Sequence, residues 1–149
     1  YEEVAYDIYR LENENKDKLG LGRIGELEEE LTLEQFAEHV KQALDVQRVR
    51  VVGNLQAKVK KVAVLGGDGN KYMTSAVMQG ADVYVTGDIY YHVAHDALMA
   101  GLNIVDPGHN VEKLMKDGLK RVLETKLQKT GHHVEVIASK VNTDPFQFI

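Results

Sequence analysis

Apolar residues recur along this chain with two periods, one typical of helices and one typical of strands. Between residues 33 and 44 the apolar positions lie three or four apart, which predicts a helix with one buried face. Thr32 and Gln35 stand where a capping box would close the first turn of that helix. Further helices are expected at residues 70–79, 89–100 and 110–127. The last of these is expected to bury its apolar side chains, which are Val111, Leu114, Met115, Leu119, Val122 and Leu123.

Strand patterns alternate with these helices. They cover residues 49–52, 59–65, 81–85, 102–105 and 132–138. The run from 59 to 65 ends in uninterrupted apolar residues, as expected of a central strand that is buried on both faces. Because short loops repeatedly join strand, helix and strand, the pattern predicts an α/β fold, a three-layer sandwich with a mainly parallel sheet.

The two ends of the chain differ from this regular pattern. Residues 1–9 alternate like a strand but have no evident partner strand nearby, and residues 12–18 have the polar composition of a linker. The sequence also lacks an initiator Met, so we expect the carboxyl-terminal piece of a longer protein. Residues 19–149 are expected to form the α/β domain, with a glycine-rich loop and a short strand at 19–27 and a capped tail at 142–149.

Composition narrows the possible functions. The 149 residues are 44% hydrophobic, and 18 basic against 23 acidic residues give a net charge of −5. This acidic balance argues against a surface built mainly for nucleic acid, and no apolar run approaches the roughly 18 residues of a membrane span. The chain has no cysteine, which excludes thiol catalysis, cysteine-bound zinc and disulfides. We therefore expect a cytoplasmic protein that binds no membrane.

Polar loops follow three of the predicted strands, at residues 66–70, 86–88 and 106–109. Because parallel strands end at the same edge of a sheet, these loops are expected to meet where α/β proteins bind ligands. The side chains that would converge there are Asp68, Asp88, Asp106 and His109. Glu112 follows His109 by three residues in the first helical turn, so both side chains can point at one spot. Histidine with carboxylates and no cysteine suits Zn, Mn, Fe or Ni, or Mg where oxygen ligands dominate.

Two of these aspartates and the glycine-rich loop also have a purely structural interpretation. Asp88 and Asp106 can simply cap helices or turns, since aspartate is a favoured capping residue. The glycine-rich loop at 66–70 can be a tight turn without a ligand, because it matches neither of the common phosphate-binding glycine motifs.

The remaining histidines carry weaker signals. His92 lies four residues after Asp88 and reaches the same site if a helix begins there. His95 is more typical of a packing or surface histidine. His132 and His133 open a predicted strand, so their side chains would face opposite ways, and we interpret both as structural.

Several motifs agree in order and spacing with one known family. They are Ala-Asp-Val-Tyr-Val-Thr-Gly-Asp-Ile at 81–89, Tyr91-His92, Val-Asp-Pro-Gly-His at 105–109, Glu112, and Asn-Thr-Asp-Pro-Phe at 142–146. Over nearly its whole length the chain resembles the GTP cyclohydrolase 1 type 2 homologue family, the NGG-interacting-factor-like dinuclear-metal proteins. The resemblance implies that this chain is the carboxyl-terminal half of a two-half dinuclear-metal fold. Residues 1–18 would then be the last strand of an inserted domain plus a linker.

The resemblance also implies cofactors and partners. Family members bind two divalent metal ions with ligands from both halves, and the positions that match here are His109 and Glu112. The amino-terminal ligands, a His-His pair and an Asp, are absent from this chain, and His132-His133 is not their equivalent. The implied partners are the missing amino-terminal half and further copies of the protein, arranged in a hexameric ring.

Two functions of different classes follow from these expectations. The first is a metal-dependent hydrolase of a nucleotide-like or phosphorylated small molecule, in which Asp88 and His92 contact substrate or transfer a proton. The alternative is a ring-forming interaction or scaffold protein with a structural or regulatory metal. An α/β domain with no metal at all is the third possibility.

Overall fold

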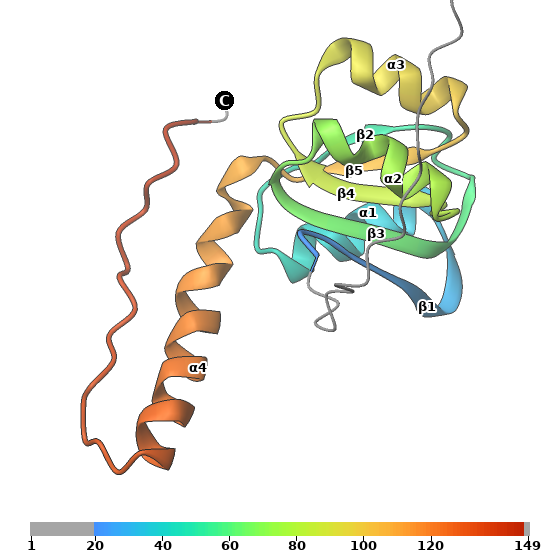
Figure 1. The fold of residues 1–149 in the computed structure, drawn as a ribbon. Helices are drawn as coiled ribbons and strands as arrows, with labels where there is room; N and C mark the ends of the chain where they lie inside the picture. The colour runs from blue at the N-terminus through green and yellow to red at the C-terminus, as the bar shows by residue number, and fades with distance from the viewer. Residues whose placement is uncertain (1–19, 148–149) are drawn as a thin grey trace, which may run out of the picture.

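A five-stranded sheet forms the centre of the computed structural model, which describes residues 20–147 (Figure 1). Its strands are β1 (Arg23–Thr32), β2 (Arg50–Val52), β3 (Lys58–Asp68), β4 (Val83–Gly87) and β5 (Asn103–Asp106). They lie in the order β1-β3-β4-β5-β2, in which β3, β4 and β5 are parallel and the two edge strands are antiparallel to their neighbours. The predicted α/β fold with a mainly parallel sheet is confirmed. β3 is an inner strand as its apolar run suggested, but it is not buried throughout, since Val64 is 46% exposed.

Helices cover both faces of the sheet. They are α1 (Leu33–Ala43), α2 (Met73–Met78), α3 (Tyr91–Met99) and α4 (Met115–Lys129), with short 3₁₀ helices η1 (Asn70–Tyr72) and η2 (His109–Leu114). α1 lies on one face, whereas α2 and α3 lie on the other, so the body has three layers (Figure 1). No helix within residues 20–147 has both the length and the apolar character that crossing a membrane requires.

The alternation of side chains along β4 builds a separate core on each face. Val83 and Val85 pack with Leu33 and Phe36 under α1. Tyr84 points the other way and packs with Ala97 under α3. Apolar packing on both faces therefore stabilises the sheet, and the polar residues at the ends of its strands lie outside these two cores.

The start of α1 follows the predicted capping box. Thr32 Oγ1 accepts a hydrogen bond from Gln35 N at 3.2 Å, and Gln35 Oε1 accepts one from Thr32 N at 3.0 Å. These two bonds satisfy backbone donors that a helix start leaves unpaired, so β1 passes directly into α1.

β3 is longer than its pattern predicted, and the loop expected at 66–70 is wrong in part. Residues 66–68 continue the strand, because a register shift after Val64 lets Asp68 pair with Gly87 of β4. This irregularity carries the chain to the rim of the sheet before η1 begins.

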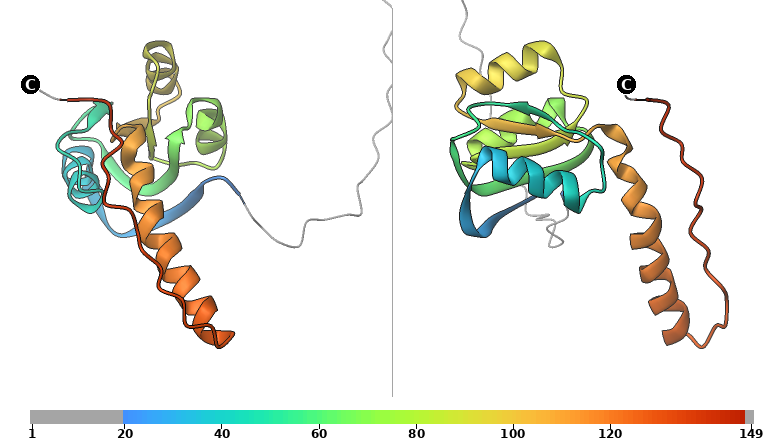
Figure 2. Two further views of the ribbon diagram at one scale, coloured as in Figure 1. Left: turned by 90° about the vertical axis from the view of Figure 1, so that its left-hand side faces the viewer. Right: turned by 180° about the vertical axis from the view of Figure 1, so that it is seen from behind.

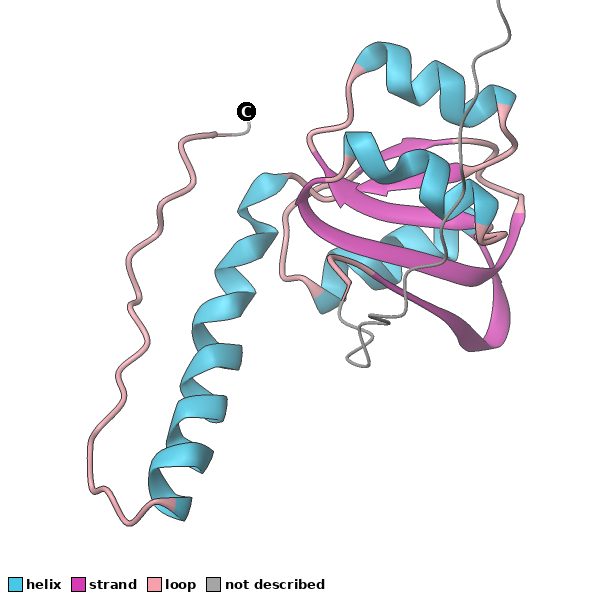
Figure 3. Cartoon of the chain, viewed as in Figure 1, coloured by secondary structure: helices cyan, strands magenta, loops and turns pink. Residues whose placement is uncertain are grey.

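The chain beyond residue 114 differs most from expectation. α4 begins five residues later than predicted, because residues 109–114 form the 3₁₀ helix η2, and it projects away from the sheet (Figure 2). Only Val111 of its predicted core residues is buried; the others, exposed by 39–61%, are Leu114, Met115, Leu119, Val122 and Leu123. Residues 132–138 are loop and not the predicted strand (Figure 3), because no described strand lies beside them to pair with. The chain runs back along α4, where Lys116 Nζ donates to Val141 O at 3.1 Å.

The sequence predicted a capped tail at one end of the chain and a strand with a linker at the other. In the tail, Asn142 Oδ1 accepts a hydrogen bond from Asp144 N, and Asp144 Oδ1 accepts one from Phe146 N, each at 3.0 Å. The predicted strand at 1–9, the linker at 12–18 and residues 148–149 lie outside the described residues. The division of the chain into residues 1–18 and 19–149 stays a prediction.

Candidate metal centre

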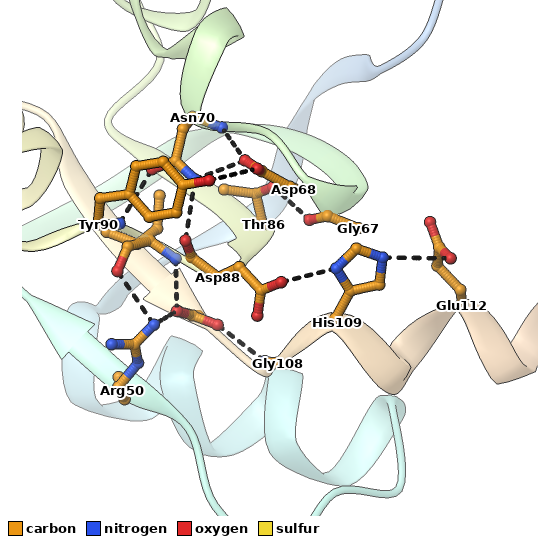
Figure 4. A network of polar contacts seen from close by, with 12 residues as sticks. Arg50, Gly67, Asp68, Asn70, Thr86, Asp88, Tyr90, Gly108, His109 and Glu112 are labelled. Atoms are coloured by element: carbon orange, nitrogen blue, oxygen red, sulfur yellow. Dashed lines mark hydrogen bonds and ion pairs between the residues drawn. The ribbon is translucent and has the colours of Figure 1, made fainter. Parts of the chain in front are cut away.

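The loops that follow β3, β4 and β5 meet at one edge of the sheet, and two of them bring an acid and a base into contact (Figure 4). Asp88 directly follows β4, and His109 opens η2 after β5. The distance from His109 Nδ1 to Asp88 Oδ2 is 2.7 Å. Because an ionised carboxylate can only accept, Nδ1 carries the proton of this hydrogen bond, and in the neutral ring Nε2 then keeps its lone pair.

Glu112 lies on the other side of the His109 ring. Its Oε2 is 3.6 Å from His109 Nε2, beyond hydrogen-bond distance, and both side chains are about half exposed. The sequence suggested an α-helical first turn, but the turn is 3₁₀, in which side chains three residues apart eclipse each other. This geometry aligns His109 and Glu112 more closely than the expected α turn would.

Gly67 lies against this pair. Its backbone has a φ of +67°, and a Cβ at this position would overlap Glu112 Oε1 and lie 3.4 Å from His109 Nε2. Only a residue without a side chain leaves room for Glu112 here. The sequence marked this loop as glycine-rich, but it gave no sign that glycine borders the His109–Glu112 pair.

Asp106 is buried and stabilises the loops of the site instead of joining the His109–Glu112 pair. Its side chain is 2% exposed and accepts hydrogen bonds from Ile89 N at 3.0 Å and Gly108 N at 2.8 Å. Arg50 forms an ion pair with the same carboxylate. Of its two predicted roles, the structural one fits Asp106, because protein donors occupy both of its oxygens.

Asp68 is turned towards two residues that the sequence did not single out, Asn70 and Tyr90. It accepts hydrogen bonds from Asn70 N at 3.0 Å and from Tyr90 Oη at 3.1 Å. The hydrogen bond from the Asn70 backbone is the main reason that the pKa of Asp68 is lowered, and the Asp68 carboxylate raises the pKa of Tyr90. Asn70 follows Asp68 by two residues in the same loop, whereas Tyr90 is 22 residues away, so no local pattern could have revealed the contact with Tyr90.

The other histidines lie apart from this cluster. His92 and His95 are on α3, where their rings pack edge-on against Tyr91 at centroid distances of 5.5 and 4.6 Å. Within the described residues, no hydrogen bond or ion pair connects His92 with Asp88 or His109. His132 and His133 follow α4 in the loop and are exposed.

Comparison with known proteins places the chain in a family. A family model described as Duf34/NIF3 (NGG1p interacting factor 3) matches residues 4–145. The chain belongs to the Duf34/NIF3 family. Its relatives include proteins called GTP cyclohydrolase 1 type 2 homolog from Halalkalibacterium halodurans and Bacillus subtilis, which are 64% and 56% identical over 149 residues. The resemblance seen in the motifs is thereby confirmed.

The relatives in this family are longer than the chain. All of the chain aligns with the two relatives just named, but it spans only 40% of their length. The crystal structure of a Bacillus cereus protein related to NIF3 matches with a TM-score of 0.87 and 64% identity, covering 99% of this chain and 40% of that one.

In this Duf34/NIF3 chain, the residues at the sheet edge suit a divalent metal but do not complete its ligand set. Two ligands about 2.0–2.2 Å from one tetrahedral ion lie roughly 3.4 Å apart, close to the 3.6 Å between His109 Nε2 and Glu112 Oε2. A carboxylate on the far nitrogen of the ring, as Asp88 provides, is the usual partner of a metal-binding histidine. Within residues 20–147, however, no three His, Cys, Asp or Glu side chains are grouped closely enough to hold an ion.

The hydrogen bond with Asp88 should be visible in the titration of His109. It is the main reason that the pKa of His109 is raised, and the nearby charge of Glu112 acts in the same direction. We expect Asp88→Asn to lower the pKa of His109, because a neutral amide stabilises the imidazolium form less. Measurement by NMR on the metal-free protein, with the exposed Asp117→Asn as control, tests this; an unchanged His109 pKa in Asp88→Asn would contradict the contact.

Proposed function

We propose that this chain is the carboxyl-terminal part of a longer, cytoplasmic, divalent-metal-dependent hydrolase that acts on a nucleotide-like or phosphorylated small molecule. The observation that carries the proposal is the row Asp88–His109–Glu112 (Figure 4). In it a carboxylate holds one ring nitrogen at 2.7 Å and leaves the other facing a second carboxylate.

The residues of this row have different tasks in the proposed centre. His109 Nε2 and a carboxylate oxygen of Glu112 would hold the metal, while Asp88 keeps the proton on Nδ1 and fixes the plane of the ring. A bound divalent metal would supply an activated water and polarise an oxygen of the substrate. Asp88 is thus better suited to orienting His109 than to the substrate contact or proton transfer that the sequence suggested. No observation supports substrate contact or proton transfer by His92 either.

The surroundings of the row favour an anionic substrate. Asp88, His109 and Glu112 line a cleft between η2 and residues 139–147, and Lys113, Lys116 and Lys140 line the same cleft. Lys113 forms an ion pair with Asp45, which lines the same cleft, whereas Lys116 Nζ donates to the neutral carbonyl of Val141. A phosphate group suits a cleft lined by lysines, which supports a phosphorylated substrate.

The rest of the ligand set would come from the remainder of the protein. His109 and Glu112 supply two ligands, and relatives that match this chain along its whole length are about 2.5 times longer (1/0.40). The proposed partner is therefore the amino-terminal half of the same protein, which would contribute the remaining ligands of a dinuclear centre. Assembly into a hexameric ring, as the resemblance implies, belongs to the same proposal.

A ring-forming interaction or scaffold protein with a structural or regulatory metal is the second candidate. It is favoured by α4, a 15-residue helix with no buried side chain and a row of exposed apolar ones. Coordination separates the two candidates, because a catalytic metal keeps one position open for water whereas a structural metal has all positions filled by protein.

The decisive experiment measures metal content. We expect His109→Ala in the full-length protein to lose most of its bound metal while remaining folded, because the variant removes a ligand from an exposed position. Plasma mass spectrometry of wild type, His109→Ala and the exposed control His133→Ala, with circular dichroism to monitor folding, gives the result. Wild-type metal content in a folded His109→Ala protein would refute the proposed centre.

A further inference from the structure

The side chain of Asn70 uses its donor and its acceptor groups to join two loops at the candidate metal centre (Figure 4). Its Nδ2 donates to Asp68 Oδ1 in its own loop and to the backbone oxygen of Asp88 at 2.9 Å. Its Oδ1 accepts a hydrogen bond from Tyr90 N at 3.0 Å. Asn70 therefore holds the backbone before and after Ile89, in the turn that connects β4 with α3.

This turn contains an unusual backbone conformation. Asp88 has a φ of +56°, and among the described residues only one other non-glycine residue, Asp45, has a positive φ. A residue with a Cβ adopts this left-handed conformation at a cost, and it persists where surrounding contacts hold it. Those contacts are Asn70 on the β3 side and the buried Asp106, which accepts from Ile89 N at 3.0 Å, on the β5 side.

The conformation of Asp88 determines where its carboxylate points. With the backbone held as observed, the carboxylate reaches His109 Nδ1 at 2.7 Å, although His109 belongs to a different loop. The two loops are also held together by close packing, because a Cβ on Gly87 would lie 2.9 Å from His109 N. A small rotation at Asp88 would therefore break the contact with the ring without disturbing the sheet.

We propose that Asn70 is a positioning residue of the metal centre: its side-chain amide fixes the left-handed turn at Asp88 and thereby orients His109. The consequence for metal binding rests on the proposed function, whereas the effect on the Asp88–His109 contact does not. Asn70 acts through Asp88 and touches neither proposed metal ligand in any hydrogen bond of the described residues.

Asn103 provides a matched control at the opposite ends of the strands. Its Nδ2 also donates to a backbone oxygen, that of Asp82, at 2.9 Å, and it too lies in a partly buried position. Asn103→Ala removes the same kind of side chain and the same kind of hydrogen bond. A loss of general stability would follow from either variant, but a change at His109 should follow only from Asn70→Ala.

The experiment uses the full-length protein and two readouts. Crystal structures of the metal-free variants should show Asp88 out of hydrogen-bond distance of His109 in Asn70→Ala, and still in contact in Asn103→Ala. Competition with a chromophoric chelator should show Zn²⁺ affinity about tenfold weaker in Asn70→Ala and unchanged in Asn103→Ala. Asn70→Asp, which keeps the acceptor for Tyr90 N but loses the donor to Asp88, should have the same effect if the alanine variant does not fold.

A double-mutant cycle tests whether Asn70 acts through Asp88. In an Asp88→Gly background there is no carboxylate left to position, so adding Asn70→Ala should weaken Zn²⁺ binding by less than about twofold further. An intact Asp88–His109 contact in the folded Asn70 variants, or fully additive effects in the cycle, would overturn the proposal. If wild type binds no Zn²⁺ but the contact still breaks only in the Asn70 variants, the positioning role stands and the proposed metal function falls.

Discussion

Replacing Asp106 with alanine should lower the free energy of unfolding by about 2–4 kcal/mol, because it leaves the backbone donors Ile89 N and Gly108 N without their acceptor. The carboxylate of Asp106 is 2% exposed and serves Ile89 N, Gly108 N and the guanidinium of Arg50. Ile89 is itself buried, so water cannot replace the lost bond at its backbone. The same bonds fix the loops that carry Asp88 and His109, so the variant should also weaken metal binding.

Urea unfolding followed by circular dichroism measures this loss of stability. Asp144→Ala is the matched control, because Asp144 also accepts a backbone hydrogen bond, from Phe146 N at 3.0 Å, but does so at an exposed site. It should change stability by less than about 0.5 kcal/mol. Equal midpoints for Asp106→Ala and wild type would show that the buried carboxylate contributes nothing to the fold.

The parts of the fold that depend on neighbouring residues could be predicted from the sequence. Thr32 and Gln35 predict the start of α1 because both partners of the capping box lie within one turn. The apolar strands β3, β4 and β5 could be placed in a parallel sheet because a helical pattern lies between each strand and the next. His109 and Glu112 could be paired because Glu112 is the third residue after His109, within one turn.

The parts that depend on distant residues could not be predicted. The amphipathic pattern of α4 predicts an apolar face, but it does not say what covers that face, and within the described residues Leu119 and Val122 stay exposed. The alternating residues 132–138 have strand character, but no strand within residues 20–147 pairs with them, so the pattern alone predicted the wrong structure. Asn70 contacts Asp88, which is 18 residues further along the chain, and a contact of this kind leaves no periodic pattern in the sequence.

Gly67 offers the sharpest test of the geometry at the metal centre. Gly67→Ala places a Cβ where Glu112 Oε1 now lies, and this oxygen is the far end of a flexible side chain. We therefore expect Glu112 to swing away and the protein to fold, with a divalent-metal affinity about 100-fold weaker, at the upper end of what disturbed metal ligation costs. Isothermal titration with Zn²⁺ on the full-length protein measures the change.

Gly101→Ala separates this effect from backbone strain. Gly101 has a φ of +74°, close to the +67° of Gly67, but a Cβ there would meet nothing within 4 Å. Both variants should lose a similar stability, about 1–2 kcal/mol, because alanine disfavours the left-handed conformation in each. Only Gly67→Ala should also lose metal affinity. Equal affinities in the two variants would mean that Glu112 is not a ligand, because a Cβ at residue 67 meets its carboxylate whereas a Cβ at residue 101 meets nothing within 4 Å.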